Sequence, residues 1–153
     1  MRKSVAAISL GSNLGDRAAL LRKALASLAL LPGTRVVVRS AFLETDAVGP
    51  PQPRFLNGAA ILETTLSPEA LLGALLGIES ALGRIRSVER GPRVIDLDLL
   101  TYGRNRSHTA FLSLPHPQLH RREFVLEPLA MIAPKLMVPG RGRVSDLLAK
   151  IRG

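Results

Sequence analysis

The chain of 153 residues has no cysteine and no tryptophan, and only 3% of its residues are aromatic. Without cysteine it can form neither a disulfide framework nor a thiolate metal site, a composition that suits a reducing compartment. The aromatic residues, four Phe and one Tyr, are too few for the interleaved aromatic and basic strands of an RNA-recognition sheet. The composition therefore argues against a disulfide-stabilised protein, a protein with a thiolate metal site and an RNA-recognition domain.

Long apolar runs are also missing. No run approaches the roughly eighteen residues that predict a membrane-spanning helix, and the N-terminus leads into a strand pattern rather than a secretory signal. We therefore expect a soluble, cytoplasmic protein with no membrane partner. A chain of this length fits one domain, predicted over residues 1–153, with a sizeable core.

The charge is strongly basic, with 21 Lys and Arg against 12 Asp and Glu and a formal net charge of +9. A solvated basic surface, a nucleic-acid partner and a phosphorylated small molecule are all compatible with this excess. Neither common nucleotide fingerprint, Gly-x-x-x-x-Gly-Lys-Ser/Thr or Gly-x-Gly-x-x-Gly after a strand, is present. Charge alone predicts an anionic partner without identifying it.

Hydrophobic periodicity predicts alternating strands and helices. The order strand, helix, strand, strand, helix, strand is typical of an α+β ferredoxin-like core, an antiparallel sheet with helices on both faces (three layers, αβα). The predicted strands cover residues 4–10, 34–42, 55–64 and the segment around 96–98, with a short one around 136–138. The predicted helices begin after residue 16 and at residue 68, and further helical segments cover 118–132 and 145–151.

The second predicted helix has clear start signals, because Ser67 can cap it and Pro68 and Glu69 suit its first turn. Its expected buried stripe is formed by Leu71, Leu75, Ile78, Leu82 and Ile85, with Glu79 on the polar face.

Two connections also stand out. The turn from Gly11 to Gly15 predicts glycines with positive φ rather than a phosphate loop. The loop over residues 44–54 is longer than most hairpin connections, and loops of that length are often functional.

The most informative segment is Gly91-Pro92-Arg93-Val94-Ile95-Asp96-Leu97-Asp98. In a strand, Asp96 and Asp98 share one face while Leu97 takes the other. Two adjacent carboxylates repel unless a cation lies between them, and Mg²⁺ prefers a few carboxylate oxygens together with water and phosphate oxygens. The alternative to a metal site is an ordinary strand with one face exposed to solvent.

Arginines precede this strand at positions 84, 86, 90 and 93, and His116 lies between two prolines further on. A guanidinium group matches phosphate oxygens with a planar set of donors, so four arginines leading to two carboxylates favour polyphosphate chemistry. The alternatives are that the arginines lie in a solvated loop and that the histidine has a structural role.

Taken together, these segments resemble the 6-hydroxymethyl-7,8-dihydropterin pyrophosphokinases of folate biosynthesis. The resemblance covers nearly the whole chain, and its most specific segment is the Gly-Pro-Arg-x-x-Asp-Leu-Asp motif at 91–98. The other matching segments are Ile8-Ser9-Leu10-Gly11-Ser12-Asn13-Leu14-Gly15, Phe55-Leu56-Asn57, and Pro115-His116 with Arg122 and Phe124.

The resemblance implies a role for each matching residue. Asp96 and Asp98 would hold two Mg²⁺ ions on the triphosphate of ATP, the co-substrate. Phe55 and Phe124 would sandwich the pterin while Asn57 bonds its edge. The full implied sets are Arg84, Arg93, Asp96 and Asp98 for catalysis; Arg84, Arg86, Arg93, His116, Arg122 and Glu79 for ATP; and Val48, Phe55, Asn57, Asp96 and Phe124 for the pterin.

Three departures from the family pattern are visible. Arg90 directly precedes Gly91, where the family often has a bulky aromatic residue, so one lid contact is missing. Leu76 stands where Gln is frequent, and Asp46 replaces a frequent Pro.

The implied reaction is attack of the hydroxymethyl oxygen on the β-phosphorus of ATP, with AMP as the leaving group. The loops 44–54 and 84–91 would close over both substrates. We expect a monomer that does not bind nucleic acid. A basic nucleic-acid-binding module and a γ-phosphoryl kinase that releases ADP are the rival hypotheses.

Overall fold

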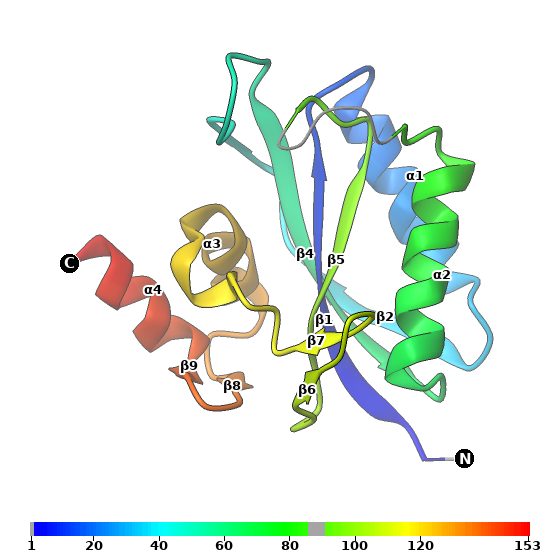
Figure 1. Cartoon of the computed structure of the whole chain (residues 1–153), viewed down its shortest axis with the longest axis vertical. Coiled ribbons are helices and arrows are strands. Elements are labelled where there is room, and N and C mark those ends of the chain that lie inside the picture. The colour runs from blue at the N-terminus through cyan, green and yellow to red at the C-terminus, as the bar shows by residue number, and fades with distance from the viewer. Residues whose placement is uncertain (1, 86–90) are drawn as a thin grey trace.

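The computed structural model describes residues 2–85 and 91–153. Its main sheet is antiparallel, with strand order β2-β4-β1-β5, and β3 extends the β2 edge by pairing with the start of β4 (Figure 1). The strands are β1 (Ser4–Ser12), β2 (Thr34–Arg39), β3 (Leu43–Thr45), β4 (Phe55–Thr64) and β5 (Asp96–Tyr102).

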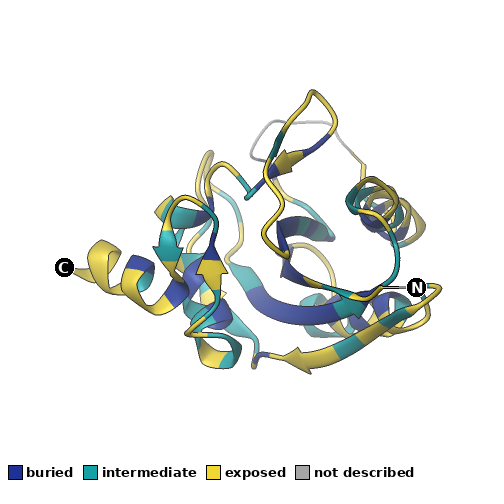
Figure 2. Cartoon of the chain, turned by 90° about the horizontal axis from the view of Figure 1, so that it is seen from below, coloured by how far each residue is buried: buried dark blue, intermediate teal, exposed yellow. Residues whose placement is uncertain are grey.

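Helices cover both faces of this sheet. On one face, α1 (Arg17–Ala29) and α2 (Pro68–Ala81) bury Leu21, Leu28, Leu71 and Leu75 against the even-numbered residues of β1. On the other face, α3 (Glu123–Ile132) and α4 (Val144–Arg152) pack around Ala7 and Leu100. The predicted α+β ferredoxin-like fold with three layers is therefore confirmed, and Figure 2 shows the buried strands between helices with exposed outer faces.

The predicted helix starts are confirmed. The Asp16 side chain accepts a hydrogen bond from the Ala19 amide (3.2 Å), and Ser67 accepts one from Ala70 (3.1 Å). These caps satisfy amides that have no partner within the helix. The prediction for Ile85 was wrong, because α2 ends at Ala81 and Ile85 is 80% exposed.

The predicted strand 34–42 is interrupted. The Ser40 amide donates to the Ala59 carbonyl (2.9 Å), while the Ser40 hydroxyl bonds both the Ala41 carbonyl and the Ala59 amide. These contacts divert the chain after β2, so that pairing resumes only at β3. Glu44 and Thr45, predicted as loop, consequently belong to β3.

The predictions for 118–132, 136–138 and 145–151 were right in type but not in extent, and one hairpin was not predicted. In that hairpin, β7 (Ser113–Leu114) pairs with β6 (Ser107–His108). Segment 118–132 divides into the 3-10 helix η1 (Leu119–Arg121) and α3, and β8 (Met137–Val138) pairs with β9 (Gly142–Arg143). None of the helices in the described ranges is long and apolar enough to cross a membrane.

Candidate active site

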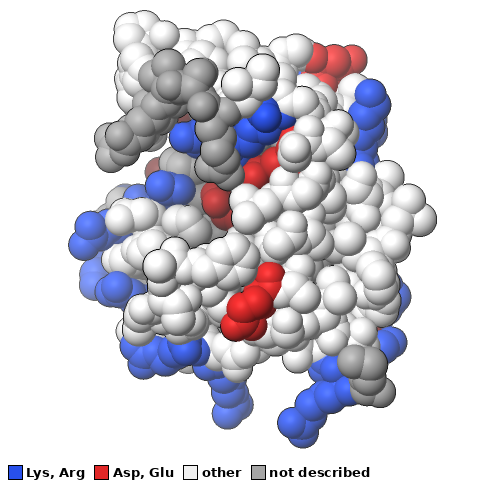
Figure 3. Space-filling model, turned by 45° about the vertical axis from the view of Figure 1, so that its right-hand side comes forward, with Lys and Arg blue, Asp and Glu red and all other residues white. Residues whose placement is uncertain are grey.

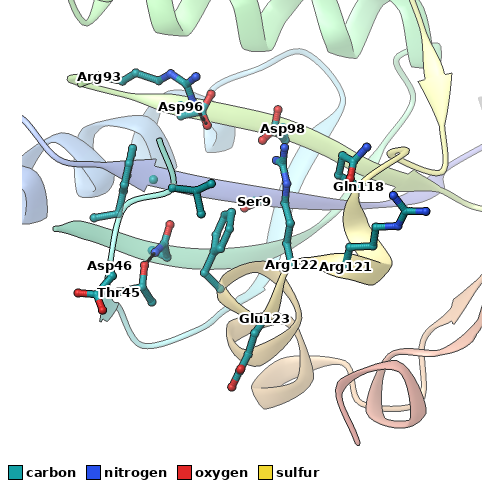
Figure 4. A pocket seen from close by; sticks show the side chains of 15 residues that line it. Ser9, Thr45, Asp46, Arg93, Asp96, Asp98, Gln118, Arg121, Arg122 and Glu123 are labelled. Atoms are coloured by element: carbon teal, nitrogen blue, oxygen red, sulfur yellow. Dashed lines mark hydrogen bonds and ion pairs between the residues drawn. The ribbon is translucent and has the colours of Figure 1, made fainter. Parts of the chain in front are cut away.

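The two carboxylates predicted on one strand face open onto a shared cavity. Asp96 lies opposite Gly11 of β1 and Asp98 opposite Ser9, whereas Leu97 points into the core on the other side of the sheet. The cavity has a volume of about 370 Å³ (Figure 4). Its lining is formed by Ser9, Gly11, Thr45, Asp46, Val48, Phe55, Asn57, Arg93, Asp96, Asp98, Gln118, Arg121, Arg122, Glu123 and Phe124.

The two aspartates have different partners. Asp96 accepts hydrogen bonds from the guanidinium groups of Arg84 (2.8 Å) and Arg93 (3.3 Å). For Asp98, the nearest charged or titratable partner in the described part of the chain is His116, with Nε2 3.9 Å from Oδ1. Burial, and then the nearby charge of Asp96, raise the pKa of Asp98 to about 7. The nearby positive charges of Arg122 and Arg84 only partly offset these effects, so Asp98 is the less compensated of the two carboxylates.

Glu79 is not on a solvated polar face, and that prediction was wrong. It is only 2% exposed, and its carboxylate accepts hydrogen bonds from the Leu97 amide (2.7 Å) and the Arg84 guanidinium (2.5 Å). Burial is the main cause of its raised pKa. Glu79 does not line the cavity; it supports β5 between the two aspartates and holds Arg84 beside Asp96.

The other residues predicted for the pterin line the same cavity as Asp96. Phe55 and Asn57 come from β4, Phe124 from α3, and Val48 from the intervening loop. Asn57 is only 4% exposed, and its Nδ2 donates to the Thr45 hydroxyl. An apolar wall and an oriented amide are thus combined in one cavity with the carboxylates.

Gly11 is needed for space rather than for positive φ. A Cβ at this position would lie 3.0 Å from Asn57 Oδ1 and 3.5 Å from a Phe55 ring carbon. Gly15, by contrast, has φ of 73° as predicted for the turn.

Arg122 and His116 approach Asp98 from another side. In Figure 4 the Arg122 side chain extends toward Asp98, and its guanidinium carbon is 5.7 Å from the centre of the Phe124 ring. His116 does not line the cavity; its Nδ1 accepts from the Gln118 amide (3.1 Å), which leaves the proton on Nε2. Burial and Arg122 lower the pKa of His116 to about 4, so the ring is neutral at pH 7.

Several residues were missed as site residues by sequence reasoning, namely Ser9, Thr45, Gln118, Arg121 and Glu123. Ser9 could have been found, because strand alternation puts it on the face of β1 that also carries Gly11. The others reach the cavity through long-range packing. Two residues of the predicted arginine cluster, Arg86 and Arg90, lie outside the described residues.

Asn13, predicted only as part of a turn, joins three segments. It is 2% exposed, its Oδ1 accepts from the Arg93 amide (2.7 Å), and its Nδ2 donates to Gln52 Oε1 (2.8 Å) and the Pro53 carbonyl (2.9 Å). The start of α1, the loop after β3 and the segment before β5 are thereby fixed around the cavity.

Charges of opposite sign alternate across this site. Figure 3 shows acidic side chains within a hollow of the surface, with basic side chains beside them. No group of three or more His, Asp or Glu side chains suited to a metal occurs among residues 2–85 and 91–153. The arrangement suits a substrate that carries its own oxygen ligands, since Mg²⁺ is commonly held by one or two carboxylates together with phosphate and water.

Comparisons of the sequence with known proteins all lead to one family. The family model of 7,8-dihydro-6-hydroxymethylpterin-pyrophosphokinase matches residues 7–134. The 2-amino-4-hydroxy-6-hydroxymethyldihydropteridine pyrophosphokinase of Methylorubrum extorquens is 48% identical over 145 residues, which cover 94% of this chain and 91% of the relative. The enzyme of the same name from Synechocystis sp. is 46% identical over 138 residues, covering 90% and 71%.

Solved structures agree on the fold. A Plasmodium falciparum HPPK-DHPS structure with SDX-DHP superposes with a TM-score of 0.76 at 13% identity. The match covers 97% of this chain but 45% of the solved chain, so this chain spans less than half the length of that relative. Because the family model covers most of the sequence and close relatives share nearly half of its residues, this chain belongs to the 7,8-dihydro-6-hydroxymethylpterin-pyrophosphokinase family.

Proposed function

We propose that this chain transfers pyrophosphate from ATP to the hydroxymethyl group of 6-hydroxymethyl-7,8-dihydropterin in folate biosynthesis, with Mg²⁺ held by Asp96 and Asp98. Membership of the family supports the reaction. The observation that carries the site assignment is one cavity that combines two carboxylates and arginines with two Phe rings and a buried amide.

The residues present fit a divalent cation. Asp96 and Asp98 offer hard oxygen donors on one strand face, and Asp98 forms no hydrogen bond with an arginine in the described ranges. Burial first, and then the charge of Asp96, raise the pKa of Asp98, and a cation at this position would relieve both effects. When bound, the cation would neutralise the carboxylates and the triphosphate oxygens. We expect two ions, as the family resemblance implies.

The arginines and His116 are proposed to bind the phosphates. Arg93 and Arg122 line the cavity on either side of the aspartates and can form two parallel hydrogen bonds to phosphate oxygens. His116 is neutral and can donate from Nε2. Arg84 is held by Glu79 and Asp96, so in this arrangement it positions Asp96, and a phosphate contact requires it to exchange a partner.

The pterin is proposed to lie between Phe55 and Phe124, with Val48 against its edge. Planar rings favour offset stacking on aromatic side chains, and Asn57 can read donor and acceptor groups on one edge of the heterocycle. The bond from Asn57 to Thr45 fixes the orientation of that amide before the substrate arrives.

The pyrophosphoryl transfer then needs alignment rather than a strong base. The hydroxymethyl oxygen loses its proton to solvent and forms a bond to the β-phosphorus, the bond from that phosphorus to the bridging oxygen of the α-phosphate breaks, and AMP leaves with that oxygen. Negative charge shifts among phosphate oxygens during this step, so positioned arginines lower the barrier electrostatically. The loop after β3 would exclude water from the cavity.

The nucleotide product distinguishes this proposal from its rivals. Incubation with ATP, Mg²⁺ and the dihydropterin should give AMP and the pterin diphosphate, and EDTA should abolish the reaction. Release of ADP would indicate γ-phosphoryl transfer instead. Absence of turnover together with tight, steeply salt-dependent RNA binding would favour a nucleic-acid module.

Variants test the site assignment separately. Asp96→Ala and Asp98→Ala should each lower kcat by orders of magnitude while the circular dichroism spectrum is kept, and near-normal turnover in both would exclude the metal assignment. The monomeric state, the single domain over 1–153 and the cytoplasmic location stay predictions, and analytical ultracentrifugation measures the first.

A further inference from the structure

The loop between β3 and β4, residues 46–54, contributes Asp46 and Val48 to the lining of the cavity, and its two halves are held differently. Its C-terminal half is fixed by Asn13, which donates to Gln52 and Pro53, and by Arg17, which donates to the Arg54 carbonyl (3.0 Å). These contacts tie residues 52–54 to the start of α1.

The N-terminal half, residues 46–49, has a single side-chain tie within the described part of the chain. Arg54 Nε lies 3.0 Å from Asp46 Oδ1 and closes the loop across its base. Asp46 and Val48 both line the cavity, and Val48 is 60% exposed. The wall that faces the pterin thus depends on one ion pair.

Arg54 is also the centre of a larger network. Its guanidinium group lies 3.8 Å from Glu44 Oε2, and Glu44 Oε1 accepts from Arg17 at 3.0 Å. Arg17 is anchored on α1 and Glu44 on β3, so the network connects the loop to two fixed elements. The Arg54 guanidinium is therefore held by Glu44, which Arg17 in turn orients, beside its contact with Asp46.

We propose that Arg54 is a positioning residue for pterin binding, because its ion pair with Asp46 holds residues 46–49 against the cavity. This inference rests on the proposed function, since it assumes that the pterin occupies this cavity. Both side chains are exposed, Arg54 by 54% and Asp46 by 91%, so salt weakens the pair. The pterin carries no net charge, so its affinity should depend on salt mainly through this pair.

The experiment is a titration of 6-hydroxymethyl-7,8-dihydropterin into the full chain with a non-hydrolysable ATP analogue and Mg²⁺. Exposed ion pairs of this kind predict that Arg54→Gln and Asp46→Asn each raise the pterin Kd by about two- to fivefold at low ionic strength. At about 0.5 M salt the difference should shrink, because the Debye length falls to about 4 Å and the exposed pair is weakened. The Kd of the ATP analogue should stay unchanged.

A matched control is available in the Arg35–Glu63 pair. Its atoms are 2.6 Å apart, its Arg35 side chain is also exposed, and it joins β2 to β4 away from the cavity. Arg35→Gln should leave the pterin Kd unchanged. The conservative variant Arg54→Lys, which keeps a cation beside both Asp46 and Glu44, should retain most of the wild-type affinity.

The outcomes distinguish failure of the positioning role of Arg54 from failure of the proposed function. If wild-type protein binds the pterin and both single variants bind it equally well at low salt, the positioning role of Arg54 is refuted while the proposed function stands. If the variants weaken the nucleotide and the pterin alike, or Arg54→Lys loses as much pterin affinity as Arg54→Gln, the positioning role is also refuted. If wild-type protein binds no pterin at any salt concentration, the proposed function itself fails.

Discussion

Replacing Asp98 with Asn is expected to stabilise the metal-free protein at pH 8 while removing its activity. Burial and the charge of Asp96 raise the pKa of Asp98 from its ordinary value of 3.8 to about 7. The unfolded chain loses this proton at about pH 4, whereas the folded protein keeps it until about pH 7. The folded state thus binds more protons in this interval, so stability falls as the pH rises through it.

The size of the effect follows from the two pKa values. A difference of about three corresponds to about 4 kcal/mol at about 1.4 kcal/mol per pKa unit. The Asp98 side chain is 29% exposed, so water screens part of the free-energy cost of ionising it in the folded state. We therefore expect this cost to be about 2 kcal/mol. An Asn amide carries no charge, so Asp98→Asn should gain this amount at pH 8 and about a third of it at pH 5, where the unfolded chain has already lost the proton and the folded protein still holds it.

Urea denaturation in EDTA at both pH values measures the gain. With an m-value of about 2 kcal/mol per M, the midpoint of Asp98→Asn should lie about 1 M above wild type at pH 8. Asp96→Asn is the control, because Asp96 bonds Arg84 and Arg93 and its loss should destabilise the protein at both pH values. Added Mg²⁺ should reduce the gain, since a cation that binds the ionised pair stabilises wild type.

The reasoning would be refuted by an Asp98→Asn midpoint at pH 8 no higher than that of wild type. An equal gain at pH 5 and pH 8 would also contradict it, because titration of this carboxyl could then not be the cause.

Three further variants probe the surroundings of the carboxylates. Gly11→Val should raise the pterin Kd by about tenfold and leave nucleotide binding intact, because a Cβ there meets Asn57 Oδ1 at 3.0 Å; isothermal titration of each ligand checks this. Phe124→Ala should likewise weaken the pterin in the same titration, and equal loss for both ligands would count against stacking. Glu79→Ala should lower the free energy of unfolding by about 3 kcal/mol in urea, since it leaves Arg84 with one buried charge partner fewer; an unchanged midpoint would contradict this.

Local patterns in the chain were enough to predict the elements that frame the site. The start of α2 at Pro68 and the full span of β4 agree with their signals, because capping and alternation act over a few residues. The shared face of Asp96 and Asp98 was predictable for the same reason. The end of α2 was not, because the helix stops before Ile85 although the apolar spacing continues.

The roles of Glu79 and Arg84 illustrate what local patterns miss. Glu79 occupies a helical position that looks solvent-facing, yet β5 lies against it and supplies the Leu97 amide as a donor. Arg84 resembles its neighbouring arginines in sequence, yet its side chain is only 11% exposed because Glu79 and Asp96 both bind it. Neither fact has a signal in the residues nearby.

By itself the sequence determined which faces of the strands and helices are apolar and that a pair of carboxylates follows an arginine-rich segment, since backbone geometry repeats every few residues. Only the tertiary structure decided that Phe55 and Phe124 meet in one cavity, that Glu79 is buried behind Asp96, and that Arg54 reaches Asp46. The physical reason is that contacts between distant segments depend on sheet register and on the packing of helices across both faces.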